Sequence, residues 1–223
     1  MAINTKNLIV KRFGEELLAL QQGVLKMSSI LQLQMHRIEE ALDAADTAAA
    51  QSVMNQDREV NAWDSLLEEH VAYLLSHRQP QSSDLRLMIG VLRMAIDLER
   101  VGDEQRNVAR QILKERPASE LVEELKRVVE PTRTMLSAAE GVVASFDVVQ
   151  ARDLMNGRLK VRHAAEHAER SIINELEVHG GAAAGVSAWS IVHSLRRMAA
   201  HLENIGEAVV YVVEGEDLRR AHP

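Results

Sequence analysis

Two acidic side chains, one turn apart on a predicted helix, have the spacing best suited to chemistry. Glu99 and Asp103 lie in the stretch from Met94 to Arg110, and residues at this spacing lie one above the other on a helix face. Carboxylates so placed repel unless they are protonated, paired with cations or bound to a metal ion. Their oxygens suit hard or borderline cations such as Mg, Ca, Mn or Fe.

A second polar row on the preceding predicted helix lies at the same helical spacing, and its members are Asp57, Asn61, Asp64 and Glu68. If the two helices pack antiparallel, the two oxygen-rich rows can meet. One interpretation is therefore a single divalent or ferric metal site in the first half, with Glu99, Asp103, Asp57 and Asn61 as its ligands.

The alternative is a solvated face that binds no metal. Arg100, Arg106 and Arg110 lie on the same predicted helix as Glu99 and Asp103, and each guanidinium can pair with a carboxylate one turn away. Spacing alone leaves both interpretations open.

A third candidate is the pattern His163-Ala164-Ala165-Glu166-His167. It matches the H-x-x-E-H motif of inverted zinc peptidases. Such an enzyme needs a third ligand and a cleft, and four basic residues crowd the same helix, so we expect an exposed helix surface here. No histidine has an acidic residue three positions before it, which excludes the Glu-x-x-His pairs of di-iron bundles. No phosphate-binding loop or nucleophile elbow occurs, so the sequence predicts no enzyme.

Composition narrows the class of protein. The chain of 223 residues contains no cysteine, which excludes disulfides, cysteine-ligated zinc and thiol catalysis. A net charge of −7 argues against a nucleic-acid partner. The opening residues lack a signal-peptide pattern and no apolar run is long enough for a membrane span, so we expect a cytoplasmic protein. Aromatic residues make up only 3%, so the core must be aliphatic, which favours helices.

Apolar residues recur every three or four positions through six long segments, which predicts six antiparallel helices in an all-α fold. The first is centred on 17–42, the second ends near His77, and the third runs from about Asp84 to Glu115. The others span about 119–145, 149–179 and 187–214, with Gly180 to Gly185 as a flexible linker.

The two halves of the chain repeat. The phrase RMAIDLERVGD from Arg93 to Asp103 recurs as RMAAHLENIGE from Arg197 to Glu207. The shared residues include polar ones that packing does not need. We therefore predict two tandem three-helix bundles related by internal duplication, divided as residues 1–116 and 117–223.

These phrases resemble the PhoU family of phosphate-uptake regulators. The third helix of that family is similar to three segments here, Asp84-Leu85-Arg86, Asp97 to Asp103, and Asn107-Val108-Ala109. Its second half is similar to the segments from Leu202 to Glu207 and from Val210 to Glu216, and its second-helix motif resembles Asp57, Val60 and Asn61.

The resemblance implies two three-helix bundles and a cytoplasmic, non-enzymatic regulator. It implies a negative regulator of phosphate uptake and phosphate-starvation signalling, connecting the ATPase subunit of a phosphate ABC transporter to a sensor histidine kinase. It further implies a protein that is often a homodimer, can lie peripherally at the membrane, and binds metal through E(D)xxxD motifs. In the first half, Glu99 and Asp103 fit that motif.

The second half departs from the family pattern. Arg158 and Arg162 occupy the positions equivalent to Asp57 and Asn61. Two guanidinium groups would repel a dication and can instead neutralise Glu203 and Glu207 in buried salt bridges, with Glu207 in place of the terminal Asp. We therefore expect at most one metal site, in the first half.

Two alternatives to the adaptor function remain open. One is a regulator of this fold with different partners, which the altered second half keeps in consideration. The other is a metalloenzyme that uses the acidic residues of the first half, against which the absence of suitably spaced histidine ligands counts.

Overall fold

The computed structural model describes residues 5–44 and 47–218, and within these the side chains of residues 5–12, 44, 57 and 179 lie outside the description. The described residues form six α-helices and no strand. The helices are α1 (Thr5–Ala44), α2 (Thr47–His77), α3 (Ser82–Lys114), α4 (Ser119–Ser145), α5 (Val148–His179) and α6 (Ala182–Glu214). The prediction of an all-α fold is confirmed.

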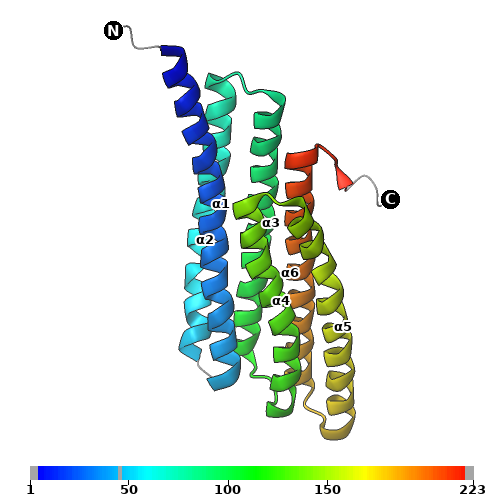
Figure 1. Cartoon of the computed structure of the whole chain (residues 1–223). Helices are drawn as coiled ribbons and strands as arrows, with labels where there is room; N and C mark the ends of the chain where they lie inside the picture. The colour runs from blue at the N-terminus through cyan, green and yellow to red at the C-terminus, as the bar shows by residue number, and fades with distance from the viewer. Residues whose placement is uncertain (1–4, 45–46, 219–223) are drawn as a thin grey trace.

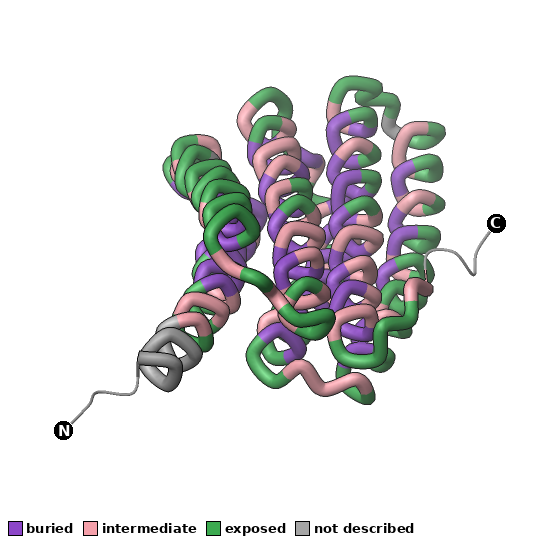
Figure 2. Tube along the Cα trace, turned by 90° about the horizontal axis from the view of Figure 1, so that it is seen from above, coloured by how far each residue is buried: buried purple, intermediate pink, exposed green. Residues whose placement is uncertain are grey.

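The helices form two antiparallel three-helix bundles side by side, α1–α3 and α4–α6 (Figure 1). The bundles meet through α3 against α6 and through α1 against α4. Seen from above, buried residues line the inner sides of the helices and exposed residues the outer sides (Figure 2). The turn between α3 and α4 contains residue 116, but the domain boundary placed there stays a prediction, because one core cluster runs through both bundles.

The core consists of Leu, Val, Ile, Met and Ala, and none of the described aromatic side chains is fully buried. Its buried positions repeat between the halves, as the duplication predicts. Leu20, Val24 and Met27 of α1 correspond to Leu121, Leu125 and Val128 of α4, and all six are buried. In α2 and α5 the same relation links Val53 and Val60 to Leu154 and Val161, which are also buried.

Local sequence signals define the helix ends. The Asp84 carboxylate accepts a hydrogen bond of 3.0 Å from the backbone N–H of Gln81, at the start of α3. At the start of α5, the Asp147 carboxylate accepts hydrogen bonds from the N–H groups of Val149 and Gln150, at 2.8 and 3.0 Å. Both contacts satisfy N–H groups that a helix leaves unpaired in its first turn.

One predicted boundary is wrong. Helix α6 begins at Ala182, whereas the sequence suggested a linker through Gly185 and a start near Ser187. Within the predicted linker, Gly180 and Gly181 adopt positive φ, at 74° and 72°, and make the turn. The three alanines that follow are the strongest helix formers. Gly185 is buried against α5, since a Cβ there would lie 2.4 Å from Leu176 Cδ2.

None of the helices in the described part of the chain is long and apolar enough to span a membrane.

Gly206 marks a contact between α5 and α6 that a larger residue would disturb. A Cβ at Gly206 would lie 2.8 Å from the backbone oxygen of Ala151, which cannot move as a flexible side chain would. We expect Gly206→Ala to lower the free energy of unfolding by about 1–3 kcal/mol, the usual effect of overpacking. Urea denaturation followed by circular dichroism measures this change.

Gly141 in α4 is the matched control, because a Cβ there would meet nothing within 4 Å. We expect Gly141→Ala to raise stability by about 0.4–1 kcal/mol through helix propensity and the smaller entropy of the unfolded chain. Equal effects of the two substitutions would contradict the packing argument.

Candidate functional site

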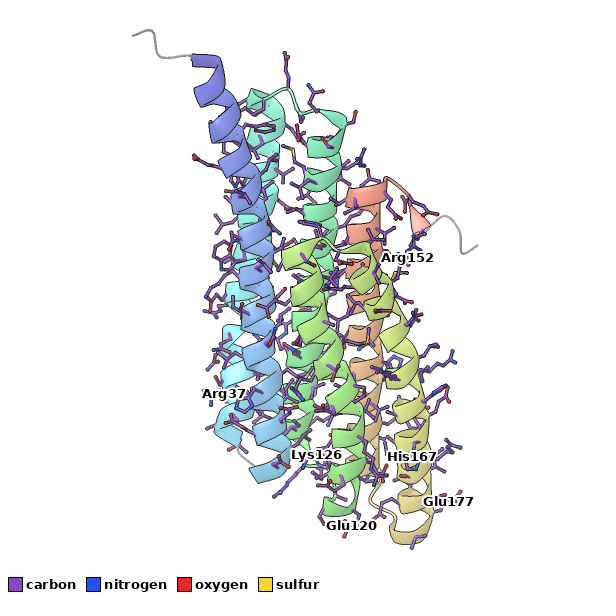
Figure 3. The ribbon with its side chains drawn as sticks, in the orientation of Figure 1. Arg37, Glu120, Lys126, Arg152, His167 and Glu177 are labelled. Atoms are coloured by element: carbon purple, nitrogen blue, oxygen red, sulfur yellow. The ribbon has the colours of Figure 1, made fainter. Side chains whose placement is uncertain are left out.

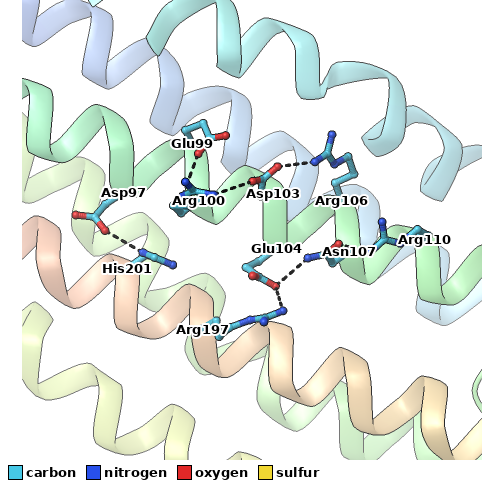
Figure 4. Close-up of polar contacts among 10 residues, drawn as sticks. All are labelled: Asp97, Glu99, Arg100, Asp103, Glu104, Arg106, Asn107, Arg110, Arg197 and His201. Atoms are coloured by element: carbon cyan, nitrogen blue, oxygen red, sulfur yellow. Dashed lines mark hydrogen bonds and ion pairs between the residues drawn. The ribbon is translucent and has the colours of Figure 1, made fainter. Parts of the chain in front are cut away.

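The two predicted metal-binding acids lie partly buried on α3, with arginines of the same helix beside them (Figure 4). Arg100 lies between them, 3.5 Å from Glu99 and 3.6 Å from Asp103. Arg106 donates a hydrogen bond of 2.6 Å to Asp103. Each carboxylate therefore has a cationic partner at an i+1 or i+3 position, as the solvated-face interpretation expects.

The facing row on α2 is only partly described. A Cβ at Gly102 would lie 3.6 Å from Val60 Cγ1, so α2 and α3 approach closely beside the acids. Asn61 is exposed, and the side chain of Asp57 lies outside the described residues. Among the side chains that are described, no group of three or more His, Cys, Asp or Glu is placed to hold a metal ion.

Asp64 of this row has a partly buried carboxylate and a shifted pKa. One of its carboxylate oxygens is buried and accepts no hydrogen bond from the described residues. Burial raises the pKa of Asp64, and the negative charge of Glu68 raises it further. Both effects disfavour the ionised form.

Two polar contacts between α3 and α6 were not predicted from the sequence (Figure 4). Glu104 is buried and accepts a hydrogen bond of 2.7 Å from Arg197. Asp97 lies 2.9 Å from His201 Nδ1 and accepts a further bond of 2.9 Å from Asn204. The repeat could have indicated the second contact, because Asp97 and His201 occupy equivalent positions in the phrases RMAIDLERVGD and RMAAHLENIGE.

In the second half, ion pairs on α5 and α6 occupy the positions that correspond to the acidic residues of α2 and α3. Arg158 contacts Glu203 as predicted, although the arginine side chain is 52% exposed and the pair is therefore not buried. Arg162 lies 3.6 Å from Glu166, one turn away on its own helix, rather than reaching across to α6 as expected. Tyr211 occupies the position equivalent to Asn107, and the centroid of its ring lies 4.2 Å from the Arg93 guanidinium carbon.

The H-x-x-E-H residues lie on the outer surface of α5, where Figure 3 labels His167. His163, Glu166 and His167 are all exposed. His167 bonds to Glu124 of α4 at 2.8 Å, while Glu166 faces Arg162. The histidines and Glu166 thus have different neighbours, in agreement with the expected exposed helix.

These features define an all-helical protein of two three-helix bundles, in which polar side chains join neighbouring helices.

The chain belongs to the PhoU family. The family model described as the PhoU domain matches residues 24–112. A phosphate-specific transport system accessory protein PhoU homolog of Pseudomonas putida is 30% identical over 216 residues, covering 95% of this chain and 84% of the relative. The homolog of Pseudomonas aeruginosa is 31% identical over 216 residues, covering 95% of this chain and 89% of the relative.

Two crystal structures agree with the fold. PhoU from Pseudomonas aeruginosa superimposes with a TM-score of 0.86 at 28% identity, covering 92% of this chain and all of that one. The phosphate transport system regulatory protein PhoU from Streptococcus pneumoniae gives a TM-score of 0.85 at 26% identity, covering 92% of this chain and 98% of that one. The family resemblance seen in the sequence is confirmed, and with it the arrangement of two bundles.

The pKa of Asp64 leads to a pH-dependent prediction. A carboxyl group whose pKa is raised on folding binds its proton more tightly in the native state, so stability falls as pH rises through the folded-state pKa. We expect Asp64→Asn to be more stable than the parent at pH 7 and the difference to shrink as the pH falls towards about 4, the usual aspartate pKa.

Urea denaturation of both proteins across this pH range measures the effect. Glu68→Gln is the control, because it removes the neighbouring charge but leaves the burial, and it should give a smaller gain of the same sign. A gain from Asp64→Asn that does not change with pH would show that shape, not charge, is responsible.

Proposed function

We propose that this protein is a negative regulator of phosphate uptake and phosphate-starvation signalling. The observation that carries the proposal is similarity along nearly the whole chain to accessory proteins of the phosphate-specific transport system, with both bundles in place. In the proposed mechanism it acts in the cytoplasm as an adaptor. It binds the ATPase subunit of a phosphate ABC transporter and a sensor histidine kinase through its helix surfaces.

The proposed mechanism needs no catalysis. Several polar side chains on α3 have partners on α6, as Glu104 with Arg197 and Asp97 with His201 illustrate. Such contacts fix the relative position of helices. They suit a protein that works by presenting surfaces. In the proposed mechanism the protein acts as a homodimer that associates peripherally with the membrane through its partners. Its net charge of −7 does not favour nucleic acid as one of them.

Deletion of the gene tests the regulatory role. With the gene deleted and phosphate in excess, we expect alkaline phosphatase to be synthesised despite the phosphate, by about tenfold or more over the parent. The intact gene on a plasmid should restore repression of alkaline phosphatase, and the empty plasmid should not. Alkaline phosphatase that stays off, together with unchanged phosphate uptake, would reject the proposal and favour a protein of this fold with other partners.

We further propose that a metal ion binds in the first half, with Glu99 and Asp103 of α3 as principal ligands and Asp57 and Asn61 of α2 beside them. The support is chemical. Carboxylate and amide oxygens suit Mn or Fe, and Asp64, one turn beyond Asn61 on α2, has a buried carboxylate oxygen that accepts no hydrogen bond from the described residues. A bound metal would compete with Arg100 and Arg106 for the acids.

Elemental analysis of the purified protein after incubation with Mn²⁺ or Fe³⁺ tests this site. We expect up to one metal ion per chain, and its loss in the double variant Glu99→Gln, Asp103→Asn. Arg106→Ala should increase the metal content at limiting metal, because it removes the competing guanidinium. Asp153→Asn, an exposed acid on α5, is the control that should change nothing. Metal retained after removal of both carboxylates would refute the assignment.

A further inference from the structure

A groove between α1 and α2 brings ring and aliphatic side chains together at the surface of the first bundle. Its volume is about 660 Å³, and Trp63, Leu66 and Tyr73 of α2 line it. Leu66 is 53% exposed and Tyr73 48%, and Leu18 of α1, near the groove, is 58% exposed. Two of the six aromatic residues of the chain thus meet at one surface groove.

The second bundle shows that the fold itself does not require this surface. In the repeat, the positions of Trp63, Leu66 and Tyr73 are occupied by Ala164, His167 and Asn174. The position of Gly23, at the base of the groove, is occupied by Glu124. There the Glu124 carboxylate lies 2.8 Å from His167 Nδ1. At these matched positions the surface of α4 and α5 is therefore polar and ion-paired, so the apolar side chains at the same positions of the first bundle need another explanation.

The geometry of the groove fits a helix. Trp63, Leu66, His70 and Tyr73 recur at intervals of three and four and so form one stripe along α2. A Cβ at Gly23 would lie 2.7 Å from Leu67 Cδ2, so α1 and α2 approach closely and leave a shallow channel above this contact. Grooves of this kind receive the apolar face of an amphipathic helix, whose anchors follow the same spacing.

The charge at the groove selects the kind of helix. Glu69 lines it, and no lysine or arginine does. Glu69 is exposed and forms no ion pair within the part of the chain that the structure describes. A lysine or arginine at the edge of an incoming apolar face would complement it.

We propose that the α1/α2 groove binds an amphipathic helix of a partner protein, with aliphatic side chains packed on Trp63, Leu66 and Tyr73 and a basic side chain paired with Glu69. The assignment of that partner to the phosphate-signalling machinery rests on the proposed function, whereas the chemistry of the groove does not. Aromatic side chains in such grooves provide most of the binding energy.

Binding of a synthetic helix to the full chain tests the groove. The probe is a fluorescein-labelled peptide of about 18 residues, or five helical turns, with leucine on one face and lysine elsewhere. A twin peptide carries glutamate in place of lysine. By fluorescence anisotropy we expect the lysine peptide to bind at least about tenfold more tightly than its twin, and Leu66→Ser to weaken it about tenfold or more.

Two further variants make the result specific. Glu69→Lys should reduce the preference for the lysine peptide, and His167→Ser, the matched change in the second bundle, should leave binding unaltered. Leu66 is exposed, so its substitution leaves the core intact, which circular dichroism checks. The proposal is wrong if Leu66→Ser binds as the parent does or if Glu69→Lys leaves the preference for the lysine peptide unchanged. It is also wrong if light scattering shows self-association that Leu66→Ser abolishes, since the occupant is then a second copy of the chain.

The same variants separate this proposal from the proposed function. In the deletion strain with excess phosphate, we expect the chain with His167→Ser to silence alkaline phosphatase and the chain with Leu66→Ser to fail. If both silence the enzyme as the intact chain does, the groove has no role in signalling, and the assignment of its partner to the phosphate-signalling machinery is wrong. If even the intact chain does not silence it, the regulatory function is wrong, and the peptide measurements alone decide whether the groove binds a helix.

Discussion

The packing of α3 against α6 is the contact on which the rest of the structure depends. Each of these helices also packs on both other helices of its own bundle, so their separation fixes the distance between the two bundles. Glycine makes the close approach possible, since a Cβ at Gly90 would lie 2.2 Å from Val212 Cγ2. At the other end, Ser187 donates hydrogen bonds to the carbonyl groups of Gln111 and Glu115, at 3.2 and 2.9 Å. Packing and polar contacts therefore act along the whole length of one helix pair.

Duplication places a special demand on this contact. Where two equivalent helices cross, a residue meets its own counterpart, and identical charges there would repel. Asp97 and His201 are such counterparts and lie 2.9 Å apart, so the two copies have become complementary at the point where they touch. Glu104 shows a related change, because its counterpart is the buried Ala208, which needs no charged partner. Different residues at equivalent positions of α3 and α6 thus allow the two similar bundles to pack against each other.

The sequence predicted what periodicity controls. Helix number, most boundaries and the duplication follow from apolar spacing, and the aliphatic core follows from the scarcity of aromatic residues. It did not predict which partner each charge would choose. Arg162 turns to Glu166 on its own helix, because a long flexible side chain has several acceptors within reach. Nor did it predict that Gln34 and Gln105 would be buried in the first half. The equivalent positions of the second half are occupied by the apolar residues Met135 and Val209. Periodicity does not distinguish a buried amide from an exposed one.

The Asp97–His201 pair also has a consequence during synthesis. Domains emerge from the ribosome in order, so α3 is complete before α6 exists, and its apolar face is briefly without a cover. Two nascent chains on neighbouring ribosomes that met through their α3 helices in the register of the native crossing would bring one Asp97 against another. Repulsion between like charges disfavours that encounter. His201, which is synthesised later on the same chain, can instead form its contact with Asp97. A contact that joins two halves of one molecule therefore also discourages the first halves of two molecules from joining each other.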